Sequence, residues 1–136
     1  MTYRPLPGET LRSALRTGEG QDDLLAAFAL FLAELHRRGI YFRSIHFGNV
    51  IVPTESGELG LIDIADMRIR RRPLGASARA RNLRHFLRYR EDVHALEAFG
   101  LERFLNIYLE TADLRGWRRM LFQRLAERTL RNGLQR

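Results

Sequence analysis

Apolar residues recur every three or four positions along most of this chain, a spacing typical of amphipathic helices. The clearest helix spans residues 21–38, with two acids in its first turn and two arginines in its last. These charges complement the helix dipole, and Gly39 follows at the place where a left-handed residue commonly ends a helix. Apolar side chains cover most of this helix, so we expect it to be central and buried on most sides.

The spacing of apolar residues predicts helices in five further ranges. The first is short, about two turns within residues 9–16, and the others lie at residues 79–89, 92–99, 101–111 and 117–130. In three of them the apolar residues at helical spacing are Leu83, Phe86, Leu87, Leu101, Phe104, Leu105, Tyr108, Trp117, Met120, Leu121 and Leu125.

Two short apolar runs interrupt the helical pattern. Val50–Val52 and Leu59–Ile64 are β-type segments, and residues 53–58 between them are rich in turn-forming types. We expect an antiparallel hairpin here. The predicted fold class is therefore α+β and predominantly α, in the order central helix, loop with hairpin, and helical C-terminal half.

The composition is that of one globular domain. The chain has 136 residues, 45% hydrophobic and 29% charged, which is enough to bury a core. It contains no cysteine, which excludes disulfides and thiolate metal sites. The longest apolar run, residues 24–35, is too short to span a bilayer, and the N-terminus does not resemble a signal peptide. We expect a cytoplasmic location, with peripheral contact at the inner membrane as a narrower option.

Arginine supplies every basic residue: all 23 are arginine, none is lysine, and the formal net charge is +7. This surplus favours an anionic partner such as a nucleotide, a phosphorylated glycan, an acidic membrane face or nucleic acid. Residues 67–90 hold nine arginines and no acid. They either bind an anionic substrate or membrane face, or form a solvated helix surface balanced by acids elsewhere. Nucleic acid ranks lower, because no zinc finger, RNA-recognition motif or helix-turn-helix spacing is present.

Candidate chemistry lies between the central helix and the hairpin. The loop reads Phe42-Arg43-Ser44-Ile45-His46-Phe47-Gly48-Asn49, and the second apolar run closes in Asp63-Ile64-Ala65. Kinase-like enzymes carry H-R-D-L-x-x-x-N on a loop after a central helix and D-F-G at the end of a hairpin. There the first Asp is the catalytic base, and the Asn and second Asp hold Mg²⁺ against the nucleotide phosphates. The segment resembles the catalytic half of a kinase-like fold, with Arg43, Asn49 and Asp63 matching.

Within kinase-like proteins, the segment resembles the bacterial lipopolysaccharide kinases, the Kdo and heptose kinases. Members show a helix ending in LH-x-x-G and a hairpin closing in L-I-D-F-D-R-G-R. Residues 35–39 (LHRRG) and 61–68 (LIDIADMR) are similar, and Tyr3–Leu11 resembles the segment just after the hinge between the two kinase lobes. A group of this family named toluene tolerance proteins shares the FRS form of the loop. The resemblance covers residues 3–90.

This resemblance implies phosphoryl transfer from ATP, with Mg²⁺, to a sugar hydroxyl of the lipopolysaccharide core. Asn49 and Asp63 would hold the metal and the nucleotide, while Arg43 and His46 would line the site. Two motif positions differ, because Ser44 stands in place of the base and Ala65 in place of the glycine. A serine keeps its proton at neutral pH, and general-base assistance is worth roughly 10²–10⁴-fold in rate.

Other parts of a kinase are missing from the chain. It has no glycine-rich phosphate loop and no lysine to pair with nucleotide phosphates, and both belong to an N-terminal lobe. We therefore predict a catalytically impaired, pseudokinase-like C-terminal lobe that binds ATP and Mg²⁺ weakly. Residues 1–20 would be a hinge-like connector with a short helix, and residues 21–136 the lobe itself. A partner, or an upstream part of a longer protein, would supply the missing lobe. The alternative is a basic, non-catalytic interaction module that binds an acidic protein, a membrane surface or nucleic acid.

The candidate residues also have structural interpretations. Asp63 could cap the hairpin or pair with Arg68, and Asn49 could serve an ordinary turn. His46 is equally well explained as a plain loop histidine. Arg43 is better explained as a structural tie to an acid than as a substrate contact.

The remaining polar residues carry weaker indications. Asp66 is interpreted as a structural acid or an arginine partner. His36, at the end of the central helix, is expected to cap or to pack. His85 and His94 cannot be separated from surface residues, and no His/Glu spacing predicts a zinc site.

Overall fold

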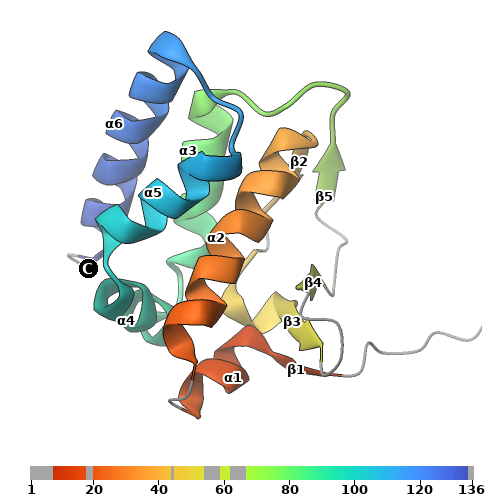
Figure 1. Cartoon of the computed structure of the whole chain (residues 1–136), viewed down its shortest axis with the longest axis vertical. Coiled ribbons are helices and arrows are strands. Elements are labelled where there is room, and N and C mark those ends of the chain that lie inside the picture. The colour runs from red at the N-terminus through yellow and green to blue at the C-terminus, as the bar shows by residue number, and fades with distance from the viewer. Residues whose placement is uncertain (1–7, 18–19, 44, 54–58, 62–66, 135–136) are drawn as a thin grey trace, which may run out of the picture.

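The structure is a computed structural model that describes residues 8–17, 20–43, 45–53, 59–61 and 67–134. This part of the chain is α+β and predominantly α, which confirms the predicted fold class (Figure 1). The elements follow in the order β1 (Gly8–Thr10), α1 (Leu11–Arg16), α2 (Gln21–Arg37), β2 (Ile40–Phe42), a 3₁₀ turn (Phe47–Asn49), β3 (Val50–Pro53), β4 (Gly60–Leu61), β5 (Met67–Ile69), α3 (Ala76–Phe86), α4 (Arg90–Phe99), α5 (Leu101–Thr111) and α6 (Gly116–Leu134).

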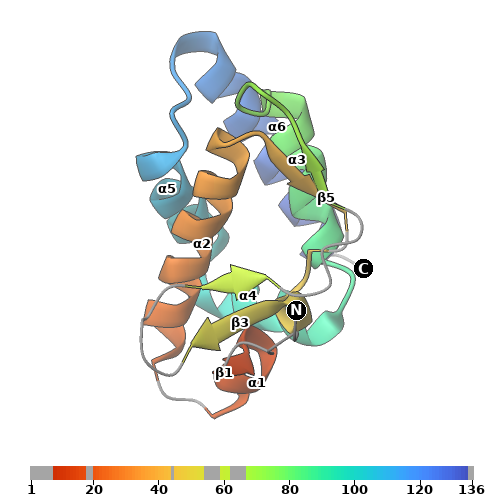
Figure 2. The same cartoon turned by 90° about the vertical axis from the view of Figure 1, so that its right-hand side faces the viewer.

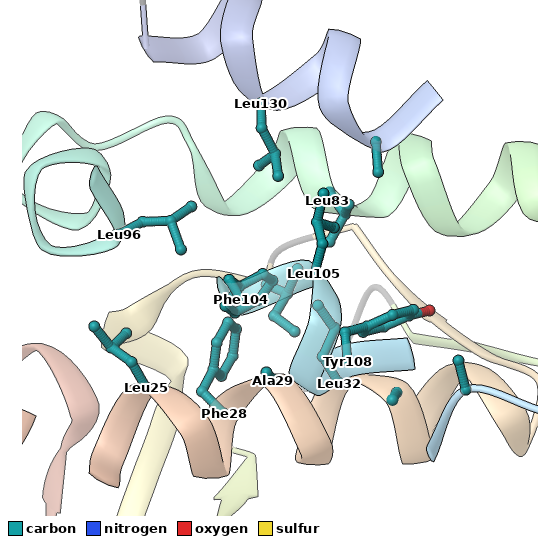
Figure 3. Close-up of a cluster of buried hydrophobic side chains, with 14 of the residues drawn as sticks. Leu25, Phe28, Ala29, Leu32, Leu83, Leu96, Phe104, Leu105, Tyr108 and Leu130 are labelled. Carbon is teal, nitrogen blue, oxygen red and sulfur yellow. The ribbon is translucent and has the colours of Figure 1, made fainter. Parts of the chain in front are cut away.

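Helix α2 is central, as its apolar pattern predicted. It lies between the small sheet beside α1 and the group formed by α3, α5 and α6 (Figures 1 and 2). Figure 3 shows its side chains meeting Leu83, Leu96, Phe104 and Leu130, which come from α3, α4, α5 and α6, in one cluster. Within this cluster the ring of Phe28 lies 6.1 Å from that of Phe104 on α5, and 5.0 Å edge-on from that of Phe47 in the 3₁₀ turn. The core therefore extends from the helices to the candidate loop.

The strands form two small antiparallel sheets. β3 pairs with β4, with Val50 opposite Leu61, which confirms the predicted hairpin over the described residues. The end of the second predicted run, residues 62–64, lies outside the described residues. β1 adds a third strand alongside β3, and β2 pairs separately with β5. Neither β1 nor the β2–β5 ribbon was expected from the sequence.

Several helix boundaries differ from the predicted ones, among them those of α4 (Arg90–Phe99) and α6 (Gly116–Leu134). The first helix begins at Leu11, because Glu9 and Thr10 pair with β3 and the Thr10 side chain accepts a hydrogen bond from the Ser13 N–H at 3.1 Å. α3 begins at Ala76, three residues before the predicted start, and ends at Phe86.

The last helix turns a different face inward from the one that its large apolar residues suggest. Phe122, Ala126 and Leu130 are fully buried, whereas Trp117 is 68% and Met120 58% exposed. Spacing at three and four positions therefore predicted a helix correctly but did not identify which face packs.

Gly39 joins the end of α2 to the β2–β5 ribbon. Its φ is +81°, and a Cβ there would lie 2.4 Å from the carbonyl oxygen of Arg70. The Arg70 N–H donates to the Gly39 carbonyl at 2.9 Å. Only glycine combines this backbone conformation with so close an approach. The predicted helix end is thus also the point that positions the ribbon.

His36 is buried in the core, in agreement with its interpretation as a packing residue. Its Nδ1 lies 2.7 Å from the Tyr108 hydroxyl and its Nε2 2.7 Å from the Asn82 side-chain oxygen. The Asn82 amide in turn donates to the Phe42 carbonyl at 2.7 Å, so the pair ties α2 and α3 to β2. Burial lowers the pKa of His36 to about 3, which keeps the ring neutral.

Arg79 is also fully buried. Its guanidinium donates to the carbonyls of Leu74 and Ala112, at 2.8 and 2.7 Å, and pairs with no carboxylate among the described residues. Its charge contributes to the lowered pKa of His36. Arg79 therefore connects α3 to Leu74, just before the helix, and to Ala112, at the end of α5, through their backbone carbonyls.

Within the described part of the chain, none of the helices combines the length and apolarity needed to cross a membrane.

Candidate functional site

The candidate loop ends in a 3₁₀ turn, Phe47–Asn49, whose N-terminal end is capped by His46. The His46 Nδ1 accepts a hydrogen bond from the Gly48 N–H at 3.0 Å, and the Asn49 N–H donates to the His46 carbonyl at 3.0 Å. Phe47 points into the core, and Asn49 is only 7% exposed. The structure thus brings His46 and Asn49 together, with His46 in a capping role.

An ion pair holds this turn against α1 and α4. The Arg12 Nε and Nη2 atoms each lie 2.8 Å from a carboxylate oxygen of Asp92, whose side chain is fully buried. Asp92 also accepts a hydrogen bond from the Phe47 N–H at 3.2 Å, and Arg12 Nη2 lies 3.2 Å from His46 Nδ1. The guanidinium covers the ring of Tyr89 at 4.3 Å. We call these five residues, Arg12, His46, Phe47, Tyr89 and Asp92, the loop anchor.

The loop anchor was not found from the sequence. Arg12 and Asp92 are 80 positions apart, and an acid in the first turn of a helix is ordinarily explained by the helix dipole. The hydrogen bond to Asp92 raises the pKa of Arg12 above its usual value. A Cβ on Gly48 would lie 2.8 Å from Arg12 Nη1, so the glycine of the loop has a packing role that its turn-forming character did not reveal.

The other predicted site residues lie apart or outside the described residues. Ser44, Asp63 and Asp66 belong to the segments that the structure does not describe. Across the described ranges, no three histidine or acidic side chains gather in a group able to hold a metal ion.

Arg43 turns away from the loop anchor. Its side chain is exposed and lines a hollow shared with arginines of β5 and α3, and its carbonyl accepts a hydrogen bond from Arg88 at 3.2 Å. It forms no ion pair with a described carboxylate, so the expected tie to an acid is not seen among those residues.

The two remaining histidines have different surroundings. His85 is half-buried beside the same hollow, with Nε2 2.9 Å from the Tyr41 hydroxyl. His94 is exposed on α4, as expected for a surface residue.

Comparison with known proteins places the fold. The sequence matches no known family profile and no curated protein. Among solved structures, the chain is similar to WaaP in complex with acyl carrier protein, with a TM-score of 0.64 and 19% sequence identity. The match covers 96% of this chain and 58% of that chain.

At this identity the likeness establishes the fold. The chain has a kinase-like, predominantly helical α+β fold and spans a little over half the length of the WaaP chain.

Proposed function

We propose that this chain is a kinase-like C-terminal lobe that binds a nucleotide and Mg²⁺ weakly, at Asn49 and Asp63, and transfers phosphoryl groups poorly or not at all. The proposal is supported by the kinase-like fold and by the position of Asn49 within it. Envelope biogenesis, the setting of lipopolysaccharide kinases, is the context that the resemblance indicates.

The observation that carries this proposal is the hairpin register. Asn49 immediately precedes Val50, and Val50 lies opposite Leu61. Asp63 follows Leu61 by two positions in the sequence. The buried Asn49 and the end of β4 at Leu61 therefore meet at one end of the hairpin, two positions before Asp63 in the sequence. Amide and carboxylate oxygens are hard ligands of the kind that Mg²⁺ prefers, so this donor set fits the ion.

Weak catalysis follows from the residues around the loop. Ser44 replaces the carboxylate that takes the proton from the attacking hydroxyl. The Nδ1 atom of His46 cannot replace it as the base, because it already accepts a hydrogen bond from Gly48 and lies 3.2 Å from Arg12. No lysine exists to pair with the nucleotide phosphates.

Thermal unfolding with nucleotide tests this proposal. ATP or ADP at 100 times its Kd should stabilise the fold by about 2.7 kcal/mol. We expect this shift only with Mg²⁺ or Mn²⁺, and we expect Asn49→Ala and Asp63→Asn to abolish it, whereas the exposed Asn106→Ala should keep it. No metal-dependent shift at millimolar nucleotide, or a shift that survives in both site variants, would refute the proposal.

A second candidate is favoured by the exposed face of α6. Trp117 and Met120 lie in solvent on a helix rich in arginine, and the Arg118 guanidinium lies 5.4 Å from the Trp117 ring centroid. An exposed apolar patch with cationic neighbours suits an acidic protein partner. WaaP is found in complex with acyl carrier protein, so a protein partner is a reasonable choice for this chain as well.

Trp117, the only tryptophan, reports on this second candidate directly. Acyl carrier protein added at 50 mM salt should shift its fluorescence to the blue, and Met120→Asp should remove the shift. Fluorescence that does not change on addition, or that changes equally in Met120→Asp, would exclude docking at α6.

A further inference from the structure

A basic hollow of about 280 Å³ lies between the β2–β5 ribbon and α3, away from the loop anchor. Figure 2 shows the ribbon beside α3. Five arginines and a tyrosine–histidine pair surround the hollow. Its lining residues are Tyr41, Arg43, Arg68, Arg70, Ala78, Arg81, Arg84 and His85.

Regular geometry directs these side chains to one place. Tyr41 lies on β2 and Arg68 on β5, while Arg43 and Arg70 directly follow the ends of these two strands, and all four residues line the hollow. Tyr41 lies directly opposite Arg68 in the antiparallel register. The other face of the ribbon carries Phe42, which is fully buried. The ribbon thus separates an apolar face toward the core from a cationic face toward α3.

Helix α3 supplies the opposite wall. Its lining residues, Ala78, Arg81, Arg84 and His85, are three and four positions apart or adjacent, which places them along one side of a helix. Ala78 is small, so the wall is set back between longer side chains and leaves room for a ligand.

The five arginines of the basic hollow form no ion pair with a described carboxylate. The arginines that do so lie elsewhere and are Arg12, Arg16, Arg37, Arg38, Arg103 and Arg115. Like charges around one hollow repel each other within the screening length of about 8 Å at physiological salt. A bound anion would relieve this repulsion and take up the free guanidinium N–H groups.

A neutral pair inside the hollow adds a directed donor. The Arg88 guanidinium, which has no acceptor atoms, lies 3.0 Å from His85 Nδ1 and therefore donates to it. The His85 Nε2–H then donates to the Tyr41 oxygen, which leaves the Tyr41 O–H able to donate to a ligand. Burial, followed by the charges of Arg88, Arg84 and Arg43, lowers the pKa of His85, in keeping with this neutral form.

We propose that the basic hollow binds a compact anion carrying two phosphoryl groups, of the pyrophosphate class. Guanidinium groups match phosphate oxygens in pairs, and five of them exceed what a single phosphate can engage bidentately. The volume is roughly nine times the ~30 Å³ that one water molecule occupies in the liquid, which leaves room for two linked phosphoryl groups. The proposal goes beyond the nucleotide site, because it requires neither metal nor Asn49.

Calorimetric titration with inorganic pyrophosphate, in EDTA and 50 mM salt, tests the proposal. We expect one site per chain. Arg68→Gln with Arg81→Gln should weaken binding about tenfold for each arginine. Both side chains are exposed, so the fold should survive, and circular dichroism will verify this. Arg70→Gln with Arg84→Gln offers a second pair from the same two walls, with the same expectation.

The matched control is Arg124→Gln with Arg128→Gln, which removes the same charge from exposed positions of α6. It should bind as the wild type does. A control that weakens binding as much as the hollow variants, or a wild type that binds no pyrophosphate, would overturn the proposal. The nucleotide proposal is unaffected by either result, because its readout depends on metal and on Asn49.

Two further arms identify the source of the phosphoryl groups. A soluble ligand predicts binding of free pyrophosphate in EDTA, without retention on vesicles. A lipid headgroup predicts sedimentation with phosphatidylcholine vesicles that contain diacylglycerol pyrophosphate, with the loss of sedimentation in Arg68→Gln/Arg81→Gln. Equal sedimentation with pure phosphatidylcholine would count against phosphate recognition at a membrane.

Discussion

The loop anchor and the basic hollow use the same residue type in opposite ways. In the loop anchor, one arginine meets a fully buried carboxylate through two hydrogen bonds of 2.8 Å and covers an aromatic ring. In the basic hollow, five arginines surround about 280 Å³ without a described carboxylate among them. In the loop anchor the guanidinium of Arg12 is paired within the protein. In the basic hollow the guanidinium groups have no described carboxylate partner.

This difference distinguishes an arginine that holds the fold together from arginines that are available to a ligand, without reference to the kinase-like motif. Arg12 is paired with Asp92, and removing that carboxylate would leave the guanidinium charge uncompensated in a mostly buried position. The arginines of the basic hollow carry exposed charges that water already solvates, so their removal should matter for ligands and little for folding. The free energy of unfolding can therefore distinguish the two regions.

Breaking the loop anchor should have the largest effect. Asp92→Asn leaves the Arg12 guanidinium without its counter-charge and weakens the hydrogen bond from the Phe47 N–H. We expect the free energy of unfolding to fall by about 3 kcal/mol, the low end for a broken buried pair, because the Arg12 side chain is 19% exposed. Urea denaturation measures this change.

Glu91→Gln is the matched control, since the neighbouring residue pairs with Arg16, one turn along α1, in solvent. That substitution should lower the free energy of unfolding by less than about 1 kcal/mol. Equal losses in the two variants would show that burial does not distinguish the two pairs.

The buried histidine gives the next largest effect, through pH. The pKa of His36 is about 3 when folded, below the ordinary value of 6.5, so the unfolded chain binds the extra proton between these values. Stability should be full above pH 6.5 and should fall as the pH drops toward 3, by about 1.4 kcal/mol per unit. The total from pH 6.5 to 5 is then about 2 kcal/mol.

Urea denaturation between pH 5 and 7 measures this slope. The exposed His94→Gln should retain it, because His94 lies on the surface of α4 and is not among the hydrogen-bond partners of His36. A wild-type stability that is flat from pH 7 to 5 would contradict a neutral, buried His36.

Local sequence pattern was enough to predict part of the fold and of the site. Helix α2 with its glycine end and the β3–β4 hairpin were all expected, because each is determined by residues close together in the chain. The adjacency of His46 and Asn49 followed from the loop motif for the same reason.

The features that could not be predicted from the sequence depend on contacts between residues far apart in the chain. The loop anchor joins positions 80 apart, and the β2–β5 ribbon joins Tyr41 to Arg68 across the whole hairpin segment. Strands of three residues carry too little alternation to be recognised by pattern alone. On α6 the apolar residues form two stripes, and contacts with α3 and α5, including the stacking of Phe122 on Tyr108, decide which stripe is buried.

The smallest expected effect completes the comparison. Arg68→Gln with Arg81→Gln should change the free energy of unfolding by less than about 0.5 kcal/mol at physiological salt, because neither charge has a described carboxylate partner. At 20 mM salt the double variant should be slightly more stable than the wild type, since it relieves repulsion that salt otherwise screens. Thermal unfolding at low and high salt measures both signs. A loss above about 1 kcal/mol would mean that these arginines hold the fold together as Arg12 does, and the contrast between the loop anchor and the basic hollow would no longer hold.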